Sequence, residues 1–437
     1  MVRIHTLNIE PAVVNSSCAW ASDYEELRDL YDSPYTGAVI TRTATFNGFS
    51  EDASNTVALA KSTVSSINSY GYSPHPLSKY LEWIYTILTT PMLDGSPPTK
   101  PVIISITAST PTVLTEMVEN IQTLRKKLRA SYSASVFGDF APSSPGQARR
   151  SSPGASSSNQ TLTAFVPDPA TLVGIELNTS CPNIKDAPPP SYNFQFLLPH
   201  LDVLSSAFYA DSTLTIGLKL PPYLYQTRFV EVVRFLHTYT REVRTATFFR
   251  GSGNNHAQPN QHVSRFLNPF AYLACTNTLG NCLLFAEDSL TNPSGTSADP
   301  ERPSADSMET DEPTSPARFS SPSNPPSPSS TGSTPPPHPP SPSTTPSIFA
   351  LPTPLGGLGG DALHPIALGN VYSFARLLAA HPDPAMRRIR IIGIGGVTSA
   401  AAAARMRQAG ASVVGCATLL GREGVRAFEI LAGHAES

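Results

Sequence analysis

Eight short apolar runs, rich in Val and Ile, recur along this chain of 437 residues. Continuous apolar runs of this length are typical of parallel strands that are covered on both faces. We therefore expect strands at residues 12–17, 37–42, 101–107, 173–180, 215–221, 271–277, 389–396 and 412–418. Amphipathic stretches predict helices at residues 22–33, 110–130, 192–209, 226–240, 366–380, 398–409 and 423–432. Ser22 is the expected N-cap of the first helix, and Glu25 would complete a capping box.

Eight strands that mostly alternate with helices predict an α/β fold, a TIM (β/α)8 barrel with low-complexity insertions. A doubly wound open sheet is the alternative, because periodicity alone does not separate the two folds. Nearly every expected strand ends in a polar residue or a glycine, such as Asn178, Lys219 and Asn277. In a barrel these ends converge on one face, where ligands bind, so the strand ends favour the barrel.

Pro accounts for 44 of the 437 residues, and it is concentrated in particular stretches. Residues 291–350 hold 16 Pro and 15 Ser, and residues 141–160 have a similar bias. Such stretches cannot bury enough apolar surface to offset the entropy lost on ordering. We predict that both are disordered inserts in a single domain spanning residues 1–437, since two barrel strands follow the longer insert. A linker between two domains is the alternative.

Charge and cysteine content argue against several classes of protein. The net charge is −3 and no basic cluster is present, which argues against nucleic acid as the main ligand. No apolar run approaches the ~20 residues of a membrane span, and the N-terminus has no signal or presequence pattern. The five Cys show no CxxC pairing, so we expect a reduced, cytoplasmic protein with neither a metal site nor a disulfide framework.

The densest polar segment is ELNTSCPNI, residues 176–184. Within it, Cys181 lies in a turn that Pro182 fixes, and a Cys at a ligand-binding face can act as a base or nucleophile. The alternative is a small buried apolar residue, which is the role we expect for Cys18, Cys275, Cys282 and Cys416.

Lys219 is the second reactive candidate, because it lies near the end of an apolar strand. A buried Lys is nearly always paired or functional, and this one could stabilise negative charge on a cofactor. The alternative is a side chain that reaches solvent at the barrel rim.

Two glycine groups, GGLGG at 356–360 and GIGG at 393–396, are candidates for a phosphate site. The second follows an expected strand, where backbone N–H groups can approach a phosphate, and Thr418 adds a hydroxyl donor. Turn geometry is the alternative for either group alone. Neither group forms a dinucleotide fingerprint or a P-loop.

Two further segments, residues 65–72 and 275–281, each place an Asn in an expected turn of small residues. Because Asn both donates and accepts hydrogen bonds, several can outline the edge of a cyclic imide or pyrimidine. Turn chemistry is the alternative for either segment alone.

The chain also contains six motifs in order: SINSYG (66–71), NTSCPN (178–183), KLPPY (219–223), TNTLGN (276–281), GGLGG (356–360) and IIGIGG (391–396). Together they resemble the cytosolic class of dihydroorotate dehydrogenases, which are FMN-dependent barrels. Their order and spacing agree with that family across nearly all of the chain outside the two inserts. Parts of residues 43–64 and 241–266 have no counterpart.

This resemblance implies oxidation of dihydroorotate to orotate in pyrimidine (UMP) biosynthesis, with FMN as the hydride acceptor. Cys181 would be the base and Lys219 would lie beside the flavin N1/O2 edge. The residues implied to hold the substrate are Arg42, Asn68, Tyr70, Gly71, Tyr72, Asn178, Asn183, Asn277 and Thr278. Those implied to hold FMN are Ser16, Ser17, Arg42, Thr43, Asn178, Lys219, Thr276, Gly359, Gly360, Gly395, Gly396, Ala417 and Thr418.

The resemblance also implies a cytoplasmic homodimer, and the KLPPY pattern resembles the branch that passes electrons to fumarate. One alternative is a related flavin enzyme, NAD-linked or acting on dihydrouracil. Another is a catalytically weak relative with an interaction role. Four positions depart from the family pattern: Arg42 stands for Lys, Cys18 and Ala417 for Gly, and Tyr70 for Met.

Overall fold

The structure, a computed structural model, describes residues 1–92, 95–137, 168–184, 189–246, 262–290 and 347–435. Residues 1–290 and 348–437 form one compact unit, whose described part is considered below. The predicted inserts lie outside the described residues, apart from the end of the longer one. There, Phe349 bridges Phe285, and the Ala350 N–H donates to the Leu284 carbonyl at 2.9 Å.

The centre of this unit is a parallel sheet of eight strands, and each expected strand is confirmed in it. In spatial order β3-β16-β15-β12-β9-β8-β7-β4, every neighbouring pair is parallel. The strands are β3 (Val13–Asn15), β4 (Val39–Ile40), β7 (Val102–Ile106), β8 (Val173–Asn178), β9 (Thr215–Leu220), β12 (Phe270–Cys275), β15 (Arg390–Ile394) and β16 (Val413–Cys416).

The two outermost strands of this order, β3 and β4, meet and nearly close the sheet into a barrel. Val14 forms a parallel bridge with Ala38. Beyond it the side chain of Asn15 replaces the ladder: Nδ2 donates to the Ile40 carbonyl at 2.6 Å, and Oδ1 accepts from the Ile40 N–H at 2.8 Å. The barrel is therefore confirmed over the open sheet, and a buried amide completes its seam.

A hairpin of β1 (Val2–Ile4) and β2 (Leu7–Ile9) covers one end of the barrel. Its Ile4, Leu7 and Ile9 are buried in one cluster with side chains of the barrel strands. The Thr6 hydroxyl also lies 2.7 Å from the hydroxyl of Thr215, the first residue of β9. Since the hairpin contacts the start of β9, it covers the amino ends of the strands and leaves the carboxyl ends open to ligands.

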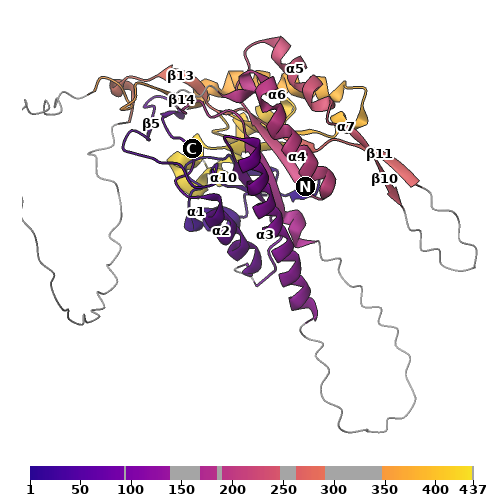
Figure 1. The fold of residues 1–437 in the computed structure, drawn as a ribbon. Helices are drawn as coiled ribbons and strands as arrows, with labels where there is room; N and C mark the ends of the chain where they lie inside the picture. Colours follow the sequence, from indigo (N-terminus) through magenta and orange to yellow (C-terminus); the bar gives the residue numbers. More distant parts are fainter. Residues whose placement is uncertain (93–94, 138–167, 185–188, 247–261, 291–346, 436–437) are drawn as a thin grey trace, which may run out of the picture. The chain divides into compact units, whose positions relative to one another are not determined.

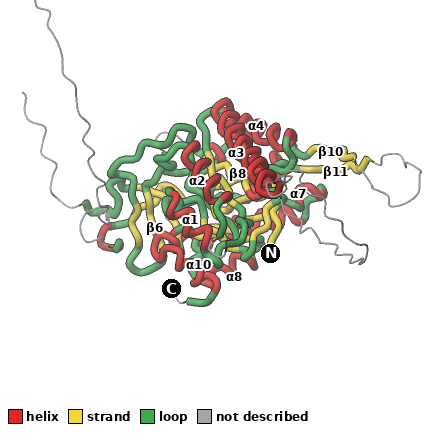
Figure 2. Tube along the Cα trace, turned by 90° about the horizontal axis from the view of Figure 1, so that it is seen from below, coloured by secondary structure: helices red, strands yellow, loops and turns green. Residues whose placement is uncertain are grey.

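Helices lie outside the strands and bury their apolar faces against them (Figures 1 and 2). The expected helices correspond to α1 (Tyr24–Asp32), α3 (Pro111–Phe137), α4 (Leu198–Ala210), α5 (Gln226–His237), α6 (His364–Ala379), α8 (Ala400–Gln408) and α10 (Ala427–Ala432). Two short helices, α7 (Pro384–Arg387) and α9 (Thr418–Glu423), add to these.

One sequence prediction about helices was wrong, and one helix was not predicted. The N-cap of α1 is Asp23, whose side chain accepts from the Glu26 N–H at 2.8 Å, while Glu26 accepts from the Ser22 N–H at 2.6 Å. The reciprocal cap therefore lies one residue later than the Ser22–Glu25 pair. Helix α2 (Leu77–Thr89) was missed, although its buried residues recur at helical spacing: Leu77, Tyr80, Ile84, Ile87 and Leu88.

A second sheet, antiparallel and of four strands, has the order β13-β14-β6-β5. Its strands are β5 (Val57–Leu59), β6 (Ser65–Asn68), β13 (Leu279–Leu283) and β14 (Leu355–Gly360). Parts of residues 65–72 and 275–281, which we expected to form turns, are strands here. The glycine group at 356–360 is also part of a strand. The reason is pairing between distant segments, such as Gly357 with Asn68 and Gly359 with Ser66. A separate hairpin joins β10 (Arg241–Ala246) to β11 (His262–Leu267).

Candidate active site

A cavity of about 960 Å³, counting space that opens to solvent, lies at the carboxyl ends of the barrel strands. Its walls come from the loops that follow the strands and from the antiparallel sheet. Of the predicted site residues, those that line it are Ser16, Ser17, Arg42, Thr43, Asn68, Tyr70, Gly71, Asn178, Cys181, Asn183, Lys219, Thr276, Asn277, Thr278, Gly359, Gly360, Gly395, Gly396, Ala417 and Thr418.

Tyr72 is the predicted site residue that the cavity wall does not include. Its half-buried ring packs edge-on against Phe49, with 5.7 Å between the ring centroids. Burial raises the pKa of the Tyr72 hydroxyl, while the charge of Cys181 raises it further and a hydrogen bond to Thr107 opposes the rise. The Tyr72 ring therefore lies outside the cavity wall but close enough to Cys181 for their charges to interact.

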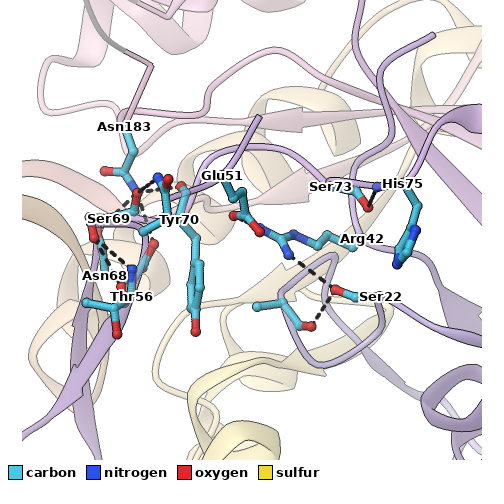
Figure 3. Close-up of polar contacts among 12 residues, drawn as sticks. Ser22, Arg42, Glu51, Thr56, Asn68, Ser69, Tyr70, Ser73, His75 and Asn183 are labelled. Carbon is cyan, nitrogen blue, oxygen red and sulfur yellow. Dashed lines mark hydrogen bonds and ion pairs between the residues drawn. The ribbon is translucent and has the colours of Figure 1, made fainter. Parts of the chain in front are cut away.

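Four Asn side chains of the cavity wall form two hydrogen-bonded pairs. Asn183 Nδ2 donates to Asn68 Oδ1 at 3.0 Å and to the Tyr70 carbonyl at 2.9 Å (Figure 3). Asn277 Nδ2 donates to Asn178 Oδ1 at 3.2 Å, and Asn178 Nδ2 donates to Thr43 Oγ1 at 2.9 Å. These contacts orient a set of amide groups along the cavity wall.

Cys181 lies in the loop after β8, and its side chain is almost wholly buried. Burial raises the pKa of its thiol, while the Asn183 N–H and the charges of Lys219 and Arg42 oppose that rise. Pro182, the next residue, packs against Gly280, where an added Cβ would lie 2.6 Å from the Pro182 Cβ. The loop is therefore held between β8 and β13, with the sulfur at the cavity.

Lys219 on β9 is buried, and its Nζ donates to the Ser17 carbonyl at 2.8 Å. Burial lowers the pKa of the ammonium, and the charge of Glu176 opposes that shift. Glu176, on β8, is fully buried and accepts from the Tyr272 hydroxyl at 3.2 Å, while its Oε1 has no hydrogen-bond partner among the described residues. The cation is thus balanced by a carboxylate in the barrel interior.

Sequence reasoning missed Glu176 and Tyr272. The sequence carries a signal for Glu176, because it lies two residues before Asn178 on the same strand. Both side chains therefore point to the same side of the sheet. Burial raises the pKa of the Glu176 carboxyl, and the charge of Lys219 opposes the rise. Gly217 makes room for this contact, because an added Cβ there would lie 2.0 Å from the Tyr272 ring.

The turn after β15 can form only with glycine. Gly395 and Gly396 have φ of +117° and +65°, and a Cβ on Gly396 would lie 2.7 Å from the Gly360 carbonyl oxygen. Backbone therefore approaches backbone closely here, which is the arrangement that suits a phosphate. His364 Nδ1 lies 2.9 Å from the Gly395 carbonyl oxygen and supports the turn.

Several hydroxyl groups face this part of the cavity. Ser66, which the sequence did not suggest, lies 2.9 Å from Thr418, oxygen to oxygen. Ser17 and Thr43 are also 2.9 Å apart. Thr276 Oγ1 is buried and has no hydrogen-bond partner within the described part of the chain. An orphaned buried hydroxyl in a cavity wall fits a bound polar group there.

Arg42 follows β4 and lines the cavity, and Figure 3 shows its polar contacts. Its Nη2 pairs with Glu51 Oε1, and its Nη1 donates to Ser22 Oγ at 3.4 Å. The guanidinium carbon lies 5.3 Å from the centroid of the Tyr70 ring. Two of the departures from the family pattern therefore contact each other.

The described residues form neither a metal cluster nor a membrane-spanning helix. No three His, Cys, Asp or Glu side chains among them gather closely enough to hold a metal ion. Within the same residues, no helix has both the length and the apolar character needed to cross a membrane.

The family model described as dihydroorotate dehydrogenase matches residues 344–434, the segment that contains β14, β15, β16 and the glycine turn. Over part of its length the chain is thus similar to dihydroorotate dehydrogenases. "Putative dihydroorotate dehydrogenase A (fumarate)" of Streptococcus agalactiae is 24% identical over 255 residues, 58% of this chain and 51% of that protein. "Probable dihydroorotate dehydrogenase A (fumarate)" of Streptococcus pneumoniae is 23% identical over 254 residues, 58% of this chain and 50% of that protein.

The chain thus spans about half the length of these curated dihydroorotate dehydrogenase relatives. The resemblance inferred from the six motifs is confirmed at the level of the family. The family match itself covers the glycine turn and Thr418, whereas Cys181 and Lys219 precede it along the chain.

Proposed function

We propose that this protein oxidises dihydroorotate to orotate with FMN as hydride acceptor, in pyrimidine biosynthesis. One observation carries the proposal: Cys181, Lys219 and the two hydrogen-bonded Asn pairs line a single cavity at the carboxyl ends of the barrel strands. Such a cavity is where enzymes of this fold bind their ligands.

The residues present fit a flavin mononucleotide. Gly359, Gly360, Gly395, Gly396, Ala417 and Thr418 would surround its phosphate, where backbone closely approaches backbone. Ser16, Ser17, Arg42, Thr43, Asn178 and Thr276 would contact the remainder, and Thr276 Oγ1 is free to do so. Bound there, the flavin supplies hydride-accepting chemistry. Lys219 would place its ammonium where reduction adds negative charge.

The amide groups suit a pyrimidine ring. Asn68, Asn178, Asn183 and Asn277, with Thr278, would hold its imide edge, and their mutual hydrogen bonds fix them before the ring arrives. Arg42, Tyr70 and Gly71 would lie toward the ring carboxylate. Tyr72 stands outside the cavity wall, so we propose for it only a packing role near Cys181.

Cys181 would take the proton from ring carbon C5 while the hydride leaves C6. Its position in a loop next to the ring-binding amides gives it access to that proton. Lys219 and Arg42 favour the thiolate that the step requires, although burial works against it. The ring loses one hydride and one proton, and a C5–C6 double bond forms.

The proposal extends to the wider role of the protein. The names of the relatives carry the word fumarate, which supports fumarate as electron acceptor. The five Cys of the described fold form no disulfide, which supports a reducing setting such as the cytoplasm. The resemblance to the cytosolic class supports a homodimer. Both location and dimer formation remain part of the proposal.

Anaerobic reduction tests the activity directly. The purified protein should be yellow, and dihydroorotate should bleach its visible absorbance. Reoxidation by fumarate, NAD or quinone in turn then identifies the acceptor. Cys181→Ala should keep the flavin but slow bleaching at neutral pH by about 10²-fold or more. A colourless protein would contradict the proposal, and faster bleaching by dihydrouracil would overturn the substrate.

A further inference from the structure

The contact between Arg42 and Glu51 bears on which rings the cavity prefers. Arg42 lines the cavity and its side chain is 7% exposed, so its charge is largely removed from water. Glu51 is not part of the cavity wall and pairs with Nη2 of the guanidinium (Figure 3). Its side chain is 20% exposed. The cation in the cavity wall is therefore already paired with a carboxylate of the protein.

The other charged side chains near Arg42 have other partners and do not replace Glu51. Glu26 is close enough to affect Arg42 electrostatically, but its carboxylate accepts from the Ser22 N–H at 2.6 Å as part of the α1 cap. Lys219 is balanced separately by Glu176 in the barrel interior. Glu51 is thus the carboxylate that pairs directly with Arg42 among the described residues.

Tyr70 restricts where the guanidinium can go. Its ring lies over Arg42, and Asn183 donates to the Tyr70 carbonyl at 2.9 Å, which fixes the backbone that carries the ring. Arg42 is thus held between Tyr70, Ser22 and Glu51 and cannot readily leave Glu51 to meet an incoming anion. A ligand carboxylate at this place must share the guanidinium with Glu51.

We propose that Glu51 is a specificity-determining residue, which weakens the preference of the cavity for a pyrimidine ring that bears a carboxylate over the same ring without one. This inference rests on the proposed function for the identity of the ring. The physical reason is that Glu51 pairs with Arg42, neutralises the cation that a ligand carboxylate would meet there, and adds a negative charge that repels that carboxylate. A ring without a carboxylate does not experience that repulsion.

The test compares orotate with uracil, which is the same ring without the carboxylate. Binding of each to the full-length protein is measured by isothermal titration calorimetry at low ionic strength. Glu51→Gln should bind orotate on the order of tenfold tighter, because one charge of a half-buried pair is removed. Uracil binding should stay unchanged. Glu51→Ala removes the same charge and should act in the same direction.

Asp52→Asn is the matched control. Asp52 is the next residue, but it is exposed and its carboxylate accepts from the Ser54 N–H and hydroxyl instead of Arg42. It should leave the ratio of orotate to uracil affinity unchanged. The inference is overturned if Glu51→Gln leaves that ratio unchanged, weakens orotate binding, or strengthens the binding of both rings equally. It is also overturned if neither ring binds to any variant. Failure of the proposed function is seen separately, as a wild-type protein whose flavin dihydroorotate does not bleach.

Discussion

Burial sets the protonation of the two reactive side chains, and in both cases it opposes the charged form. It raises the pKa of Cys181 and lowers that of Lys219, while charges within the site oppose both shifts. The charge of Lys219 lowers the pKa of Cys181, and the charge of Cys181 raises the pKa of Lys219. Each side chain therefore favours the charged form of the other. The proton on one therefore depends on the charge of the other.

A pH dependence follows from the Cys181 thiol. Its pKa lies above the ordinary value of 9.0, so the thiolate fraction is small at neutral pH and grows as the pH rises. The rate of anaerobic flavin reduction by dihydroorotate should therefore increase with pH up to at least about pH 9. Stopped-flow rates across this range measure it. Cys181→Ala should lose the dependence; a wild-type rate independent of pH would point to another base.

At the scale of elements, the site depends on where strands end and which distant segments pair. The predicted strands were found because apolar runs are local signals. The antiparallel sheet was not predicted, because β6 and β14 are far apart in the sequence and only their pairing makes them strands. Asn68, for example, donates to the Gly357 carbonyl across 289 positions. Glycines in β14 allow the close approach, since a Cβ on Gly356 would lie 2.5 Å from the Asn68 carbonyl oxygen.

The turn that ends β15 gives a prediction at this scale. Gly396→Ala should lower the free energy of unfolding by about 1–2 kcal/mol from the positive φ, and by a further ~2 kcal/mol from overpacking. It should also weaken FMN binding. Gly424→Ala is the control, because its φ is +59° but nothing lies within 4 Å of an added Cβ. For both variants, denaturant unfolding measures the loss of stability and FMN titration measures the loss of affinity. Equal losses in the two variants would contradict the role of the close packing at Gly396.

At the scale of the whole molecule, the barrel is built from segments on both sides of the longer predicted insert. β13 precedes residues 291–346 and β14 follows them, and the two strands pair directly. The chain on either side is anchored: the Leu290 N–H donates to the Leu59 carbonyl at 2.7 Å, and the Ala286 N–H to the Ile348 carbonyl at 2.9 Å. The described fold therefore holds both ends of this stretch independently of what lies between them.

Replacing residues 291–346 with a short Gly/Ser linker should leave FMN bound and flavin reduction by dihydroorotate unchanged. The physical reason is that the residues lining the cavity come from before Leu279 or from after Leu358, and that loop-closure cost changes slowly with loop length. Flavin absorbance and reduction rate measure the outcome. The same replacement of residues 141–160 serves as the comparison. Loss of FMN from the first variant alone would show that the insert supports the site.

The sequence by itself determined the strands of the barrel, the polar residues at their ends and the family resemblance, because each is written in local patterns of a few residues. Only the tertiary structure decided which side chains meet. Asn15 closes the seam, Tyr272 reaches Glu176, and Glu51 takes the guanidinium of Arg42. Such contacts arise when barrel closure brings separate strands and loops together, and no local periodicity records them.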